Sequence, residues 1–304
     1  MSNIKVKGYL AQFQNSVISK IILNADFQVA YPCSYIPYSC KEKNNSCALH
    51  LYENIRHVYG YECERLDIDL TSTYFEGKEC ILAVFGYSRD HRSDCPQIVI
   101  AFVVDQKGVL VTHRVWPGNQ TDAKSLEMVD TCLRDDFGLK APRVVDRGIA
   151  TWKNIDYMVK KKERYLVALR AGVKSTGLLE EIGTPKDEWA EIRKDAVAAS
   201  VTRGRRKYVV AWTASVAEAE KYDGYQVFVT TETDMNEKEV VDSYKIRDEI
   251  KKAIQTLKNV LGLHTQYVRT KEHVLGNIFA CATAYQLRSI LRLKLKESGF
   301  DTSV

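Results

Sequence analysis

The sequence predicts an α/β protein built on a mixed β-sheet that helices cover on both faces. Short runs rich in β-branched and aromatic residues recur from residue 65 onward, as in strands. From about residue 122 such runs alternate with helical patterns, which is typical of a layered α/β sheet. The C-terminal part, from about 236 to 297, is helical in pattern. The 304 residues allow one large domain or two modest ones.

The order of the expected elements is three antiparallel strands, helix, strand, helix, strand. Gln106-Lys107-Gly108 joins two of the strands as a hairpin turn. Asp122 is a plausible N-cap for a helix from about 123 to 136. The expected strands are 66–75, 79–87, 96–105, 109–116, 142–148, 164–170 and 225–233.

Composition excludes several classes of protein. Hydrophobic residues make up 45% of the chain and charged residues 27%, as in a globular protein. No apolar run approaches the roughly 18 residues of a membrane span, and the first residues lack the apolar core of a secretory signal. We therefore expect no membrane partner and a cytoplasmic protein. The net charge of +5 is compatible with nucleic acid but is weak evidence for it.

Four segments differ in character. Residues 1–64 give the weakest pattern and resemble a truncated N-terminal region. Residues 65–170 carry the first part of the core, and residues 171–222 form an expected β-rich insertion. Residues 223–304 supply the last core strand and the C-terminal helices.

Two aspartates stand at or near strand ends. Asp69 lies in a strand whose alternation puts it on one face with Asp67, and Asp146 ends an apolar strand. A buried acid is costly unless it is paired or binds metal, and two such acids on neighbouring strands would suit Mg²⁺ or Mn²⁺. The alternative is an edge-strand surface acid at 67 or 69 and a turn-forming Asp146.

Five blocks of sequence, in this order, resemble those of a known family. They are DLTSTYFEG (69–77), GYSRDHRSDCPQ (86–97), PGNQTD (117–122), VVDRG (144–148) and YDGYQVFVTTET (222–233). The blocks are similar to those of bacterial and archaeal insertion-sequence transposases of the cut-and-paste group, over residues 65–296. The resemblance implies an RNase H-like catalytic core with a DDE active site. It also implies DNA transposition, by metal-dependent strand cleavage and strand transfer at element ends.

The resemblance also implies roles, partners and a cofactor. Asp69 and Asp146 match the first two catalytic acids, each binding Mg²⁺ or Mn²⁺ in a two-metal site. Arg89, His91 and Arg92 match a loop near the site that could hold phosphate, although a solvated turn explains them equally. The implied partners are terminal inverted repeats and target DNA, and a homodimer is compatible with the family. The implied location is the prokaryotic cytoplasm, at the nucleoid.

The last family signature is Tyr, two residues, Arg, three residues, Glu, six residues, Lys. Tyr244, Arg247 and Lys258 match it, and the resemblance implies that they contact DNA near the cleaved end. Lys251 stands where the family has its catalytic Glu. On one continuous helix at about 100° per residue, Tyr244, Lys251 and Lys258 share a face.

A lysine at this position repels a divalent ion and cannot act as a carboxylate ligand. One hypothesis is a transposase by descent that is inactive, or a non-catalytic DNA-binding remnant. A second is an active enzyme in which Asp248 or Glu249 substitutes for the third acid, with Asp248 about 60° from the shared face. A third is another RNase H-like nuclease.

Overall fold

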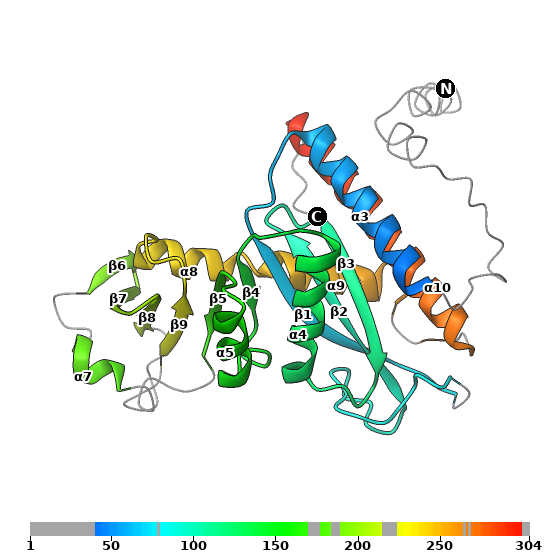
Figure 1. Cartoon of the computed structure of the whole chain (residues 1–304), viewed down its shortest axis with the longest axis horizontal. Coiled ribbons are helices and arrows are strands. Elements are labelled where there is room, and N and C mark those ends of the chain that lie inside the picture. The colour runs from blue at the N-terminus through cyan, green and yellow to red at the C-terminus, as the bar shows by residue number, and fades with distance from the viewer. Residues whose placement is uncertain are drawn as a thin grey trace. The chain divides into compact units, whose positions relative to one another are not determined.

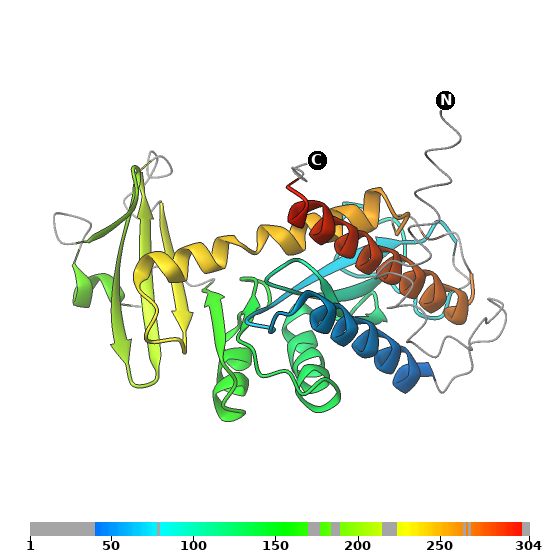
Figure 2. The same ribbon diagram turned by 90° about the horizontal axis from the view of Figure 1, so that it is seen from above.

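The computed structural model describes residues 40–77, 80–169, 177–183, 189–214, 224–263, 266 and 269–299. Helices and strands alternate along much of this part of the chain (Figures 1 and 2). No helix of the described residues combines the length and the apolar character that crossing a membrane requires. Most of the predicted N-terminal segment, residues 1–39, lies outside the described residues.

Hydrogen bonds order nine strands into one mixed sheet, β3-β2-β1-β4-β5-β9-β8-β7-β6. The β1–β4 and β4–β5 pairs are parallel, whereas the pairs from β5 through β9 to β6 are antiparallel. The predicted fold class is confirmed, including the β-rich insertion. The strands are β1 Leu66–Tyr74, β2 Gln97–Asp105, β3 Leu110–Pro117, β4 Arg143–Val145, β5 Tyr165–Ala168, β6 Ala190–Arg193, β7 Ala196–Arg203, β8 Arg206–Thr213 and β9 Tyr225–Thr230.

Helices precede, interrupt and follow the strands. A π-helical turn, Cys132–Asp136, continues α4, and Thr121 rather than the predicted Asp122 occupies the N-cap of that helix. The C-terminal part is helical, as predicted. The helices are α3 Cys40–Tyr59, α4 Asp122–Thr131, α5 Trp152–Lys160, α7 Leu178–Ile182, α8 Glu237–Lys245, α9 Asp248–Asn259 and α10 Lys271–Glu297.

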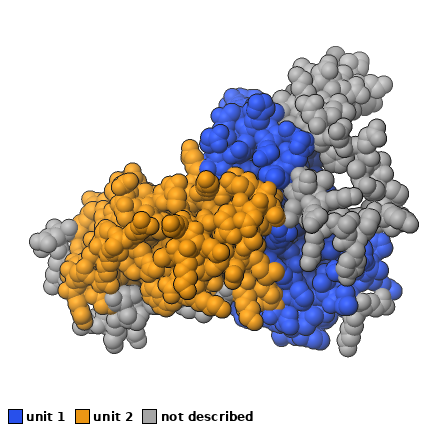
Figure 3. Space-filling view, viewed as in Figure 1, with its two compact units in different colours: residues 1–63, 71–119, 253–304 blue, residues 64–70, 120–252 orange. Residues whose placement is uncertain are grey.

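The chain divides into two compact units (Figure 3). Strand β1 and helix α9 contribute residues to both units. Unit 1 comprises residues 1–63, 71–119 and 253–304. Its β2 is buried along its whole length and forms the predicted hairpin with β3. Helices α3 and α10 pack on β3 and on each other, and the Tyr59 hydroxyl donates to the Ile290 carbonyl at 3.2 Å. Burial of these apolar surfaces provides the main driving force for folding of this unit.

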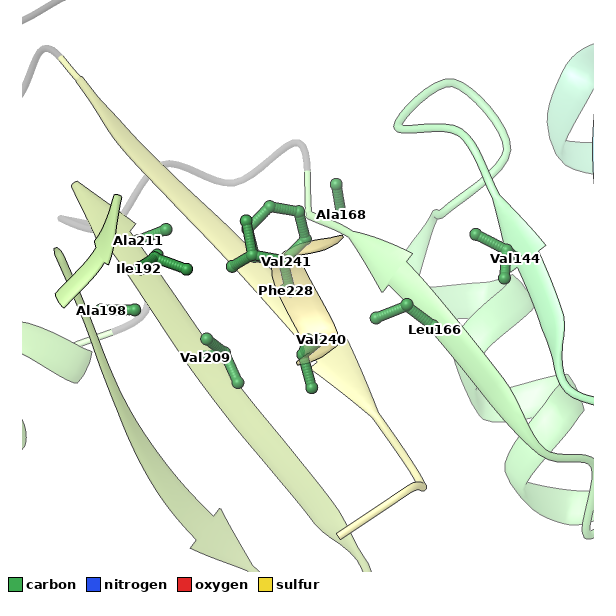
Figure 4. Close-up of a cluster of buried hydrophobic side chains, with 10 residues drawn as sticks. All are labelled: Val144, Leu166, Ala168, Ile192, Ala198, Val209, Ala211, Phe228, Val240 and Val241. Atoms are coloured by element: carbon green, nitrogen blue, oxygen red, sulfur yellow. The ribbon is translucent and has the colours of Figure 1, made fainter. Parts of the chain in front are cut away.

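Unit 2 comprises residues 64–70 and 120–252. Figure 4 shows its apolar cluster, in which Val240 and Val241 of α8 lie over side chains from the strands. Phe228 of β9 is buried in this cluster, and the ring of Tyr244 packs against it at a centroid distance of 5.0 Å. This packing fixes α8 on the sheet and thereby fixes the start of the turn that follows it.

Two details differ from the sequence prediction. Residues 80–87 form no strand but a loop that carries one isolated bridge, Val84 to Gln97. The strand-like composition of this segment reflects exposed side chains, Ile81 and Phe85 among them, rather than a buried face. The expected continuous helix through Tyr244 and Lys258 is broken after Lys245, so one helical wheel does not describe both residues.

Candidate functional site

Parallel pairing of β1 with β4 brings Asp69 and Asp146 to the same level of the sheet in unit 2. The register pairs Ile68 with Val145, so the acids are the next residues along the two adjacent strands. Asp69 lies within β1, whereas Asp146 follows the last residue of the short β4. The sequence prediction that these two acids meet at neighbouring strands therefore agrees with the observed geometry.

Arg247 faces both carboxylates. Its Nη1 donates to Asp146 Oδ1 at 3.1 Å, and its Nη2 lies 3.8 Å from Asp69 Oδ2. Nη1 also donates to the Tyr244 hydroxyl at 2.8 Å. The Arg247 side chain is only 4% exposed, whereas that of Asp146 is 48% exposed. A buried guanidinium therefore provides the positive charge between the two acids.

The local backbone explains how Arg247 reaches this position. Asn236 begins α8 with a capping box, in which its side chain accepts from the Glu239 N–H and the Glu239 carboxylate accepts from the Asn236 N–H. After α8 ends, Arg247 lies on the turn before α9, and its N–H donates to the Tyr244 carbonyl at 3.2 Å. Ile250 in the first turn of α9 is fully buried and anchors the other side of this turn.

The charges at this site shift one another's pKa values. Burial raises the pKa of Asp146, but the Arg247 charge, the Arg147 N–H, the hydrogen bond from Arg247 and the Lys251 charge outweigh it, so the net pKa lies below the usual value. Burial lowers the pKa of Arg247, but Tyr244, Asp69 and Asp146 raise it more, and the net shift is upward. Both groups are therefore held in their charged forms.

Lys251 is exposed, and its charge contributes to lowering the pKa of Asp146. Its Nζ lies 3.9 Å from Asp248 Oδ1, and Asp248 is itself exposed. Glu249 pairs instead with Lys252, at 3.0 Å. Among the residues that the structure describes, no three His, Cys, Asp or Glu side chains form a group that could hold a metal ion.

The donors present do not fit a two-metal site. Two divalent ions need several carboxylate ligands between them. This site offers only two carboxylates, and both face the guanidinium of Arg247. An ammonium occupies the third position and adds repulsion. Arg247 thus supplies, inside the protein, one positive charge against the two carboxylates.

The other predicted residues belong to unit 1. Lys258 Nζ contacts Asp90 Oδ1 at 2.5 Å, which fixes the 88–94 loop to α9. His91 has a φ of 56°, and Arg92 forms a two-pronged ion pair with Asp94 at 2.9 Å. The Arg89 N–H donates to Ser72 Oγ at 3.1 Å. Hydrogen bonds and ion pairs therefore tie this loop to the rest of unit 1, although His91 and Asp94 are exposed.

Sequence reasoning missed two partnerships. Arg247 was expected on DNA, not against the acids, and Asp90 was not singled out although it lies within the block GYSRDHRSDCPQ. Its position between Arg89 and Arg92 was the available signal. No local pattern, however, indicates that Asp90 pairs with a residue 168 positions away.

Comparison with known proteins gives a family and a fold. Residues 64–287 match the family model described as a transposase DDE domain. A piggyBac transposase synaptic complex with hairpin DNA is similar over 90% of this chain and 57% of that chain, at 11% identity and a TM-score of 0.54. This chain therefore spans a little over half the length of that relative. No curated protein matches the sequence significantly.

Two structures of Mos1 transposase show much weaker similarity. The match to the paired-end complex with the left transposon end covers 51% of this chain and 49% of that chain, at 10% identity and a TM-score of 0.25. The match to the mariner paired end complex with Mn covers 50% of this chain and 50% of that chain, at 9% identity and a TM-score of 0.23. Similarity this low carries no inference about the chain.

Proposed function

The chain belongs to the transposase DDE domain family, and from this premise we propose that it is a DNA-transposition protein that binds DNA without cutting it. Transposases act on the ends of mobile elements, so the proposed ligands are terminal inverted repeats and target DNA. The piggyBac relative is a synaptic complex with hairpin DNA, which supports a DNA partner. We further propose that two copies pair as a homodimer.

One observation carries the proposed lack of cleavage. Lys251 stands where the family signature has its third acid, whereas Arg247, which contacts both Asp146 and Asp69, matches that signature. Loss of one member of a catalytic group that acts as a unit typically lowers the rate by several powers of ten. The protein therefore keeps a family framework around an acid pair that lacks its third carboxylate.

The proposed DNA contacts come from both units. Tyr244 and Arg247 lie beside the acid pair, and Arg247 could exchange Asp146 for a DNA phosphate because both are anions with oxygen acceptors. Arg89, His91, Arg92 and Lys258 are proposed to contact the DNA backbone from unit 1. Such contacts give salt-dependent affinity without base specificity.

The family implies dependence on a divalent metal, and we propose Mg²⁺ or Mn²⁺ as the ion. With a third carboxylate at position 251, Asp69 and Asp146 would each hold the ion, which would supply charge stabilisation at a phosphodiester. Because the charge of Lys251 opposes metal binding, we expect metal-dependent cleavage to return only when a third carboxylate is introduced. The alternative third acid is Asp248. To bind the ion, its carboxylate would have to give up its ion pair with Lys251.

A nicking assay tests this proposal. The substrate is a supercoiled plasmid carrying the element ends, with Mg²⁺ or Mn²⁺, and the protein is compared with Lys251→Glu. We expect the unaltered protein to bind the plasmid without nicking it. The Lys251→Glu variant is expected to nick at least about 100-fold faster, because the third carboxylate is restored.

Two controls separate the charge from the carboxylate. Lys251→Gln removes the ammonium without adding a ligand and should not nick, and Lys251→Glu combined with Asp146→Asn should also be inactive. If the unaltered protein nicked the plasmid, and if Asp69→Asn abolished that nicking, the proposal of an inactive site would be wrong. If Asp248→Asn also abolished it, Asp248 would be the third acid. Failure to bind any DNA would overturn the proposed function altogether.

A further inference from the structure

Unit 1 exposes a group of large apolar side chains on one loop. In the loop between β1 and β2, Tyr87 is 80% exposed and Phe85 is 55% exposed, and Ile81 is also largely exposed. Leaving such side chains in water forgoes the free energy that burial would give, so a cluster of them marks an interaction site more often than a single one does. We name residues 81–89 the aromatic loop.

The backbone of the aromatic loop is held in place. Val84 and Gln97 exchange backbone hydrogen bonds at 3.0 and 3.1 Å. Gly86 and Gly118 approach so closely that a Cβ at position 86 would lie 2.0 Å from the Gly118 carbonyl oxygen. Both rings therefore project from a fixed support, and binding to them costs little ordering of the backbone.

Charge favours a polyanion at this surface. The guanidinium of Arg89 lies 6.0 Å from the centroid of the Tyr87 ring, within range of a cation–π contact. The two acids of the adjoining segment are each paired with a cation, Asp90 with Lys258 and Asp94 with Arg92. The acids are thus compensated, and a phosphate can approach the aromatic side chains.

Exposed rings beside cations are the arrangement that binds unpaired nucleotides, because every base has a face that stacks and every linkage carries a phosphate. We propose that Phe85 and Tyr87 form a stacking platform for unpaired DNA bases, with Arg89 on the adjacent phosphate. The platform rests on the proposed function and extends it to a DNA structure: a single strand, a flap or a mismatched end. A second copy of this chain is the competing occupant.

Competition binding tests the platform without knowledge of the element ends, because stacking tolerates any sequence. Affinities of the full chain for a single strand, a duplex with a mismatched end and a fully paired duplex are measured by fluorescence anisotropy at several salt concentrations. We expect Phe85→Ala and Tyr87→Ala each to weaken binding of unpaired DNA by roughly 5- to 100-fold, the effect of losing one stacked base. Binding of the paired duplex should change little.

Matched variants separate stacking from burial of apolar area. Tyr87→Phe keeps the ring and should keep the preference for unpaired DNA, whereas Tyr87→Leu keeps apolar area without a ring and should lose it. Trp152→Ala removes an exposed aromatic side chain from α5 and should leave the preference unchanged. Circular dichroism and thermal melting confirm that each variant is folded.

Three results would overturn the platform. The unaltered protein could bind paired and unpaired DNA equally, Tyr87→Leu could behave as Tyr87→Phe does, or Tyr87→Ala could abolish self-association in analytical ultracentrifugation while leaving DNA binding intact. The last result would assign the loop to a second copy of the chain. Duplex binding without preference rejects only the platform, whereas absence of all DNA binding rejects the proposed function as well.

Discussion

Two arginines of unit 2 each face two acids, but their hydrogen bonding differs. Arg143 is fully buried; its Nε donates to Asp130 at 2.9 Å, and its Nη2 lies 3.2 Å from Glu163. Its remaining N–H groups donate to the carbonyls of Ala141 and Leu139. Each guanidinium nitrogen thus has an acceptor, as a buried charge requires.

Arg247 is almost as buried but less satisfied. Its Nε and Nη2 have no hydrogen-bond partner among the described residues, although Nη2 lies within ion-pair distance of Asp69. Its partner Asp146 is half exposed. N–H groups of a buried cation that make no hydrogen bond cost free energy. A ligand that accepts hydrogen bonds from those N–H groups would recover that free energy. The comparison indicates that the Arg143 network is structural and that the Arg247 site can accept an anion.

Replacing each arginine by methionine should give the largest difference between the two sites. Arg143→Met leaves Asp130 buried without its main partner, and we expect a loss of about 3–5 kcal/mol in the free energy of unfolding. Arg247→Met should cost less than about 2 kcal/mol, because water can solvate the half-exposed Asp146 and because Asp69, at 3.8 Å, lies beyond hydrogen-bond distance of Arg247. Urea denaturation followed by circular dichroism measures both values. Equal losses would show that the Arg247 cluster is as structural as the other.

A smaller effect concerns pH. The folded pKa of Asp146 lies below its usual value, so its pairing stabilises the protein above the ordinary carboxylate pKa of about 4. That contribution is lost as pH falls through the folded pKa. We expect Asp146→Asn to be less stable than the unaltered protein at pH 7 by no more than about 1 kcal/mol, since the half-exposed pair is screened.

Thermal melting of both proteins across the acid range measures this difference. It should shrink as pH decreases and vanish once Asp146 is protonated in both the folded and the unfolded chain. A difference that stays constant with pH would mean that the substitution acts through packing and not through the charge of Asp146.

Local sequence predicted the strands that carry the acids because their composition and alternation are short-range signals. Asp69 and Asp146 could be placed on neighbouring strands only with the help of the family resemblance, since pairing of β1 with β4 joins residues about 77 positions apart. The contact of Arg247 with both acids could not be predicted, because it depends on a break between α8 and α9. Ile246 and Ile250 continue the apolar spacing across that break and conceal it.

The loop at residues 80–87 shows the converse failure. Ile81, Phe85 and Tyr87 have the β-propensity of a strand, but that propensity reflects burial against neighbouring strands more than a backbone preference. Gly86 makes the close approach to Gly118 possible, and this approach replaces a regular ladder there. An exposed aromatic loop and a buried strand have the same composition, so the sequence alone could not separate them.

Manganese binding is the most direct test of the claim that positions 69, 146 and 251 form one site in which lysine replaces the third acid. Isothermal titration with Mn²⁺ compares the unaltered protein, Lys251→Glu, and Lys251→Glu combined with Asp146→Asn. We predict at least tenfold tighter binding by Lys251→Glu than by the unaltered protein, and loss of that gain in the double variant. Equal affinities of the first two proteins, or a gain that persists without Asp146, would contradict the claim.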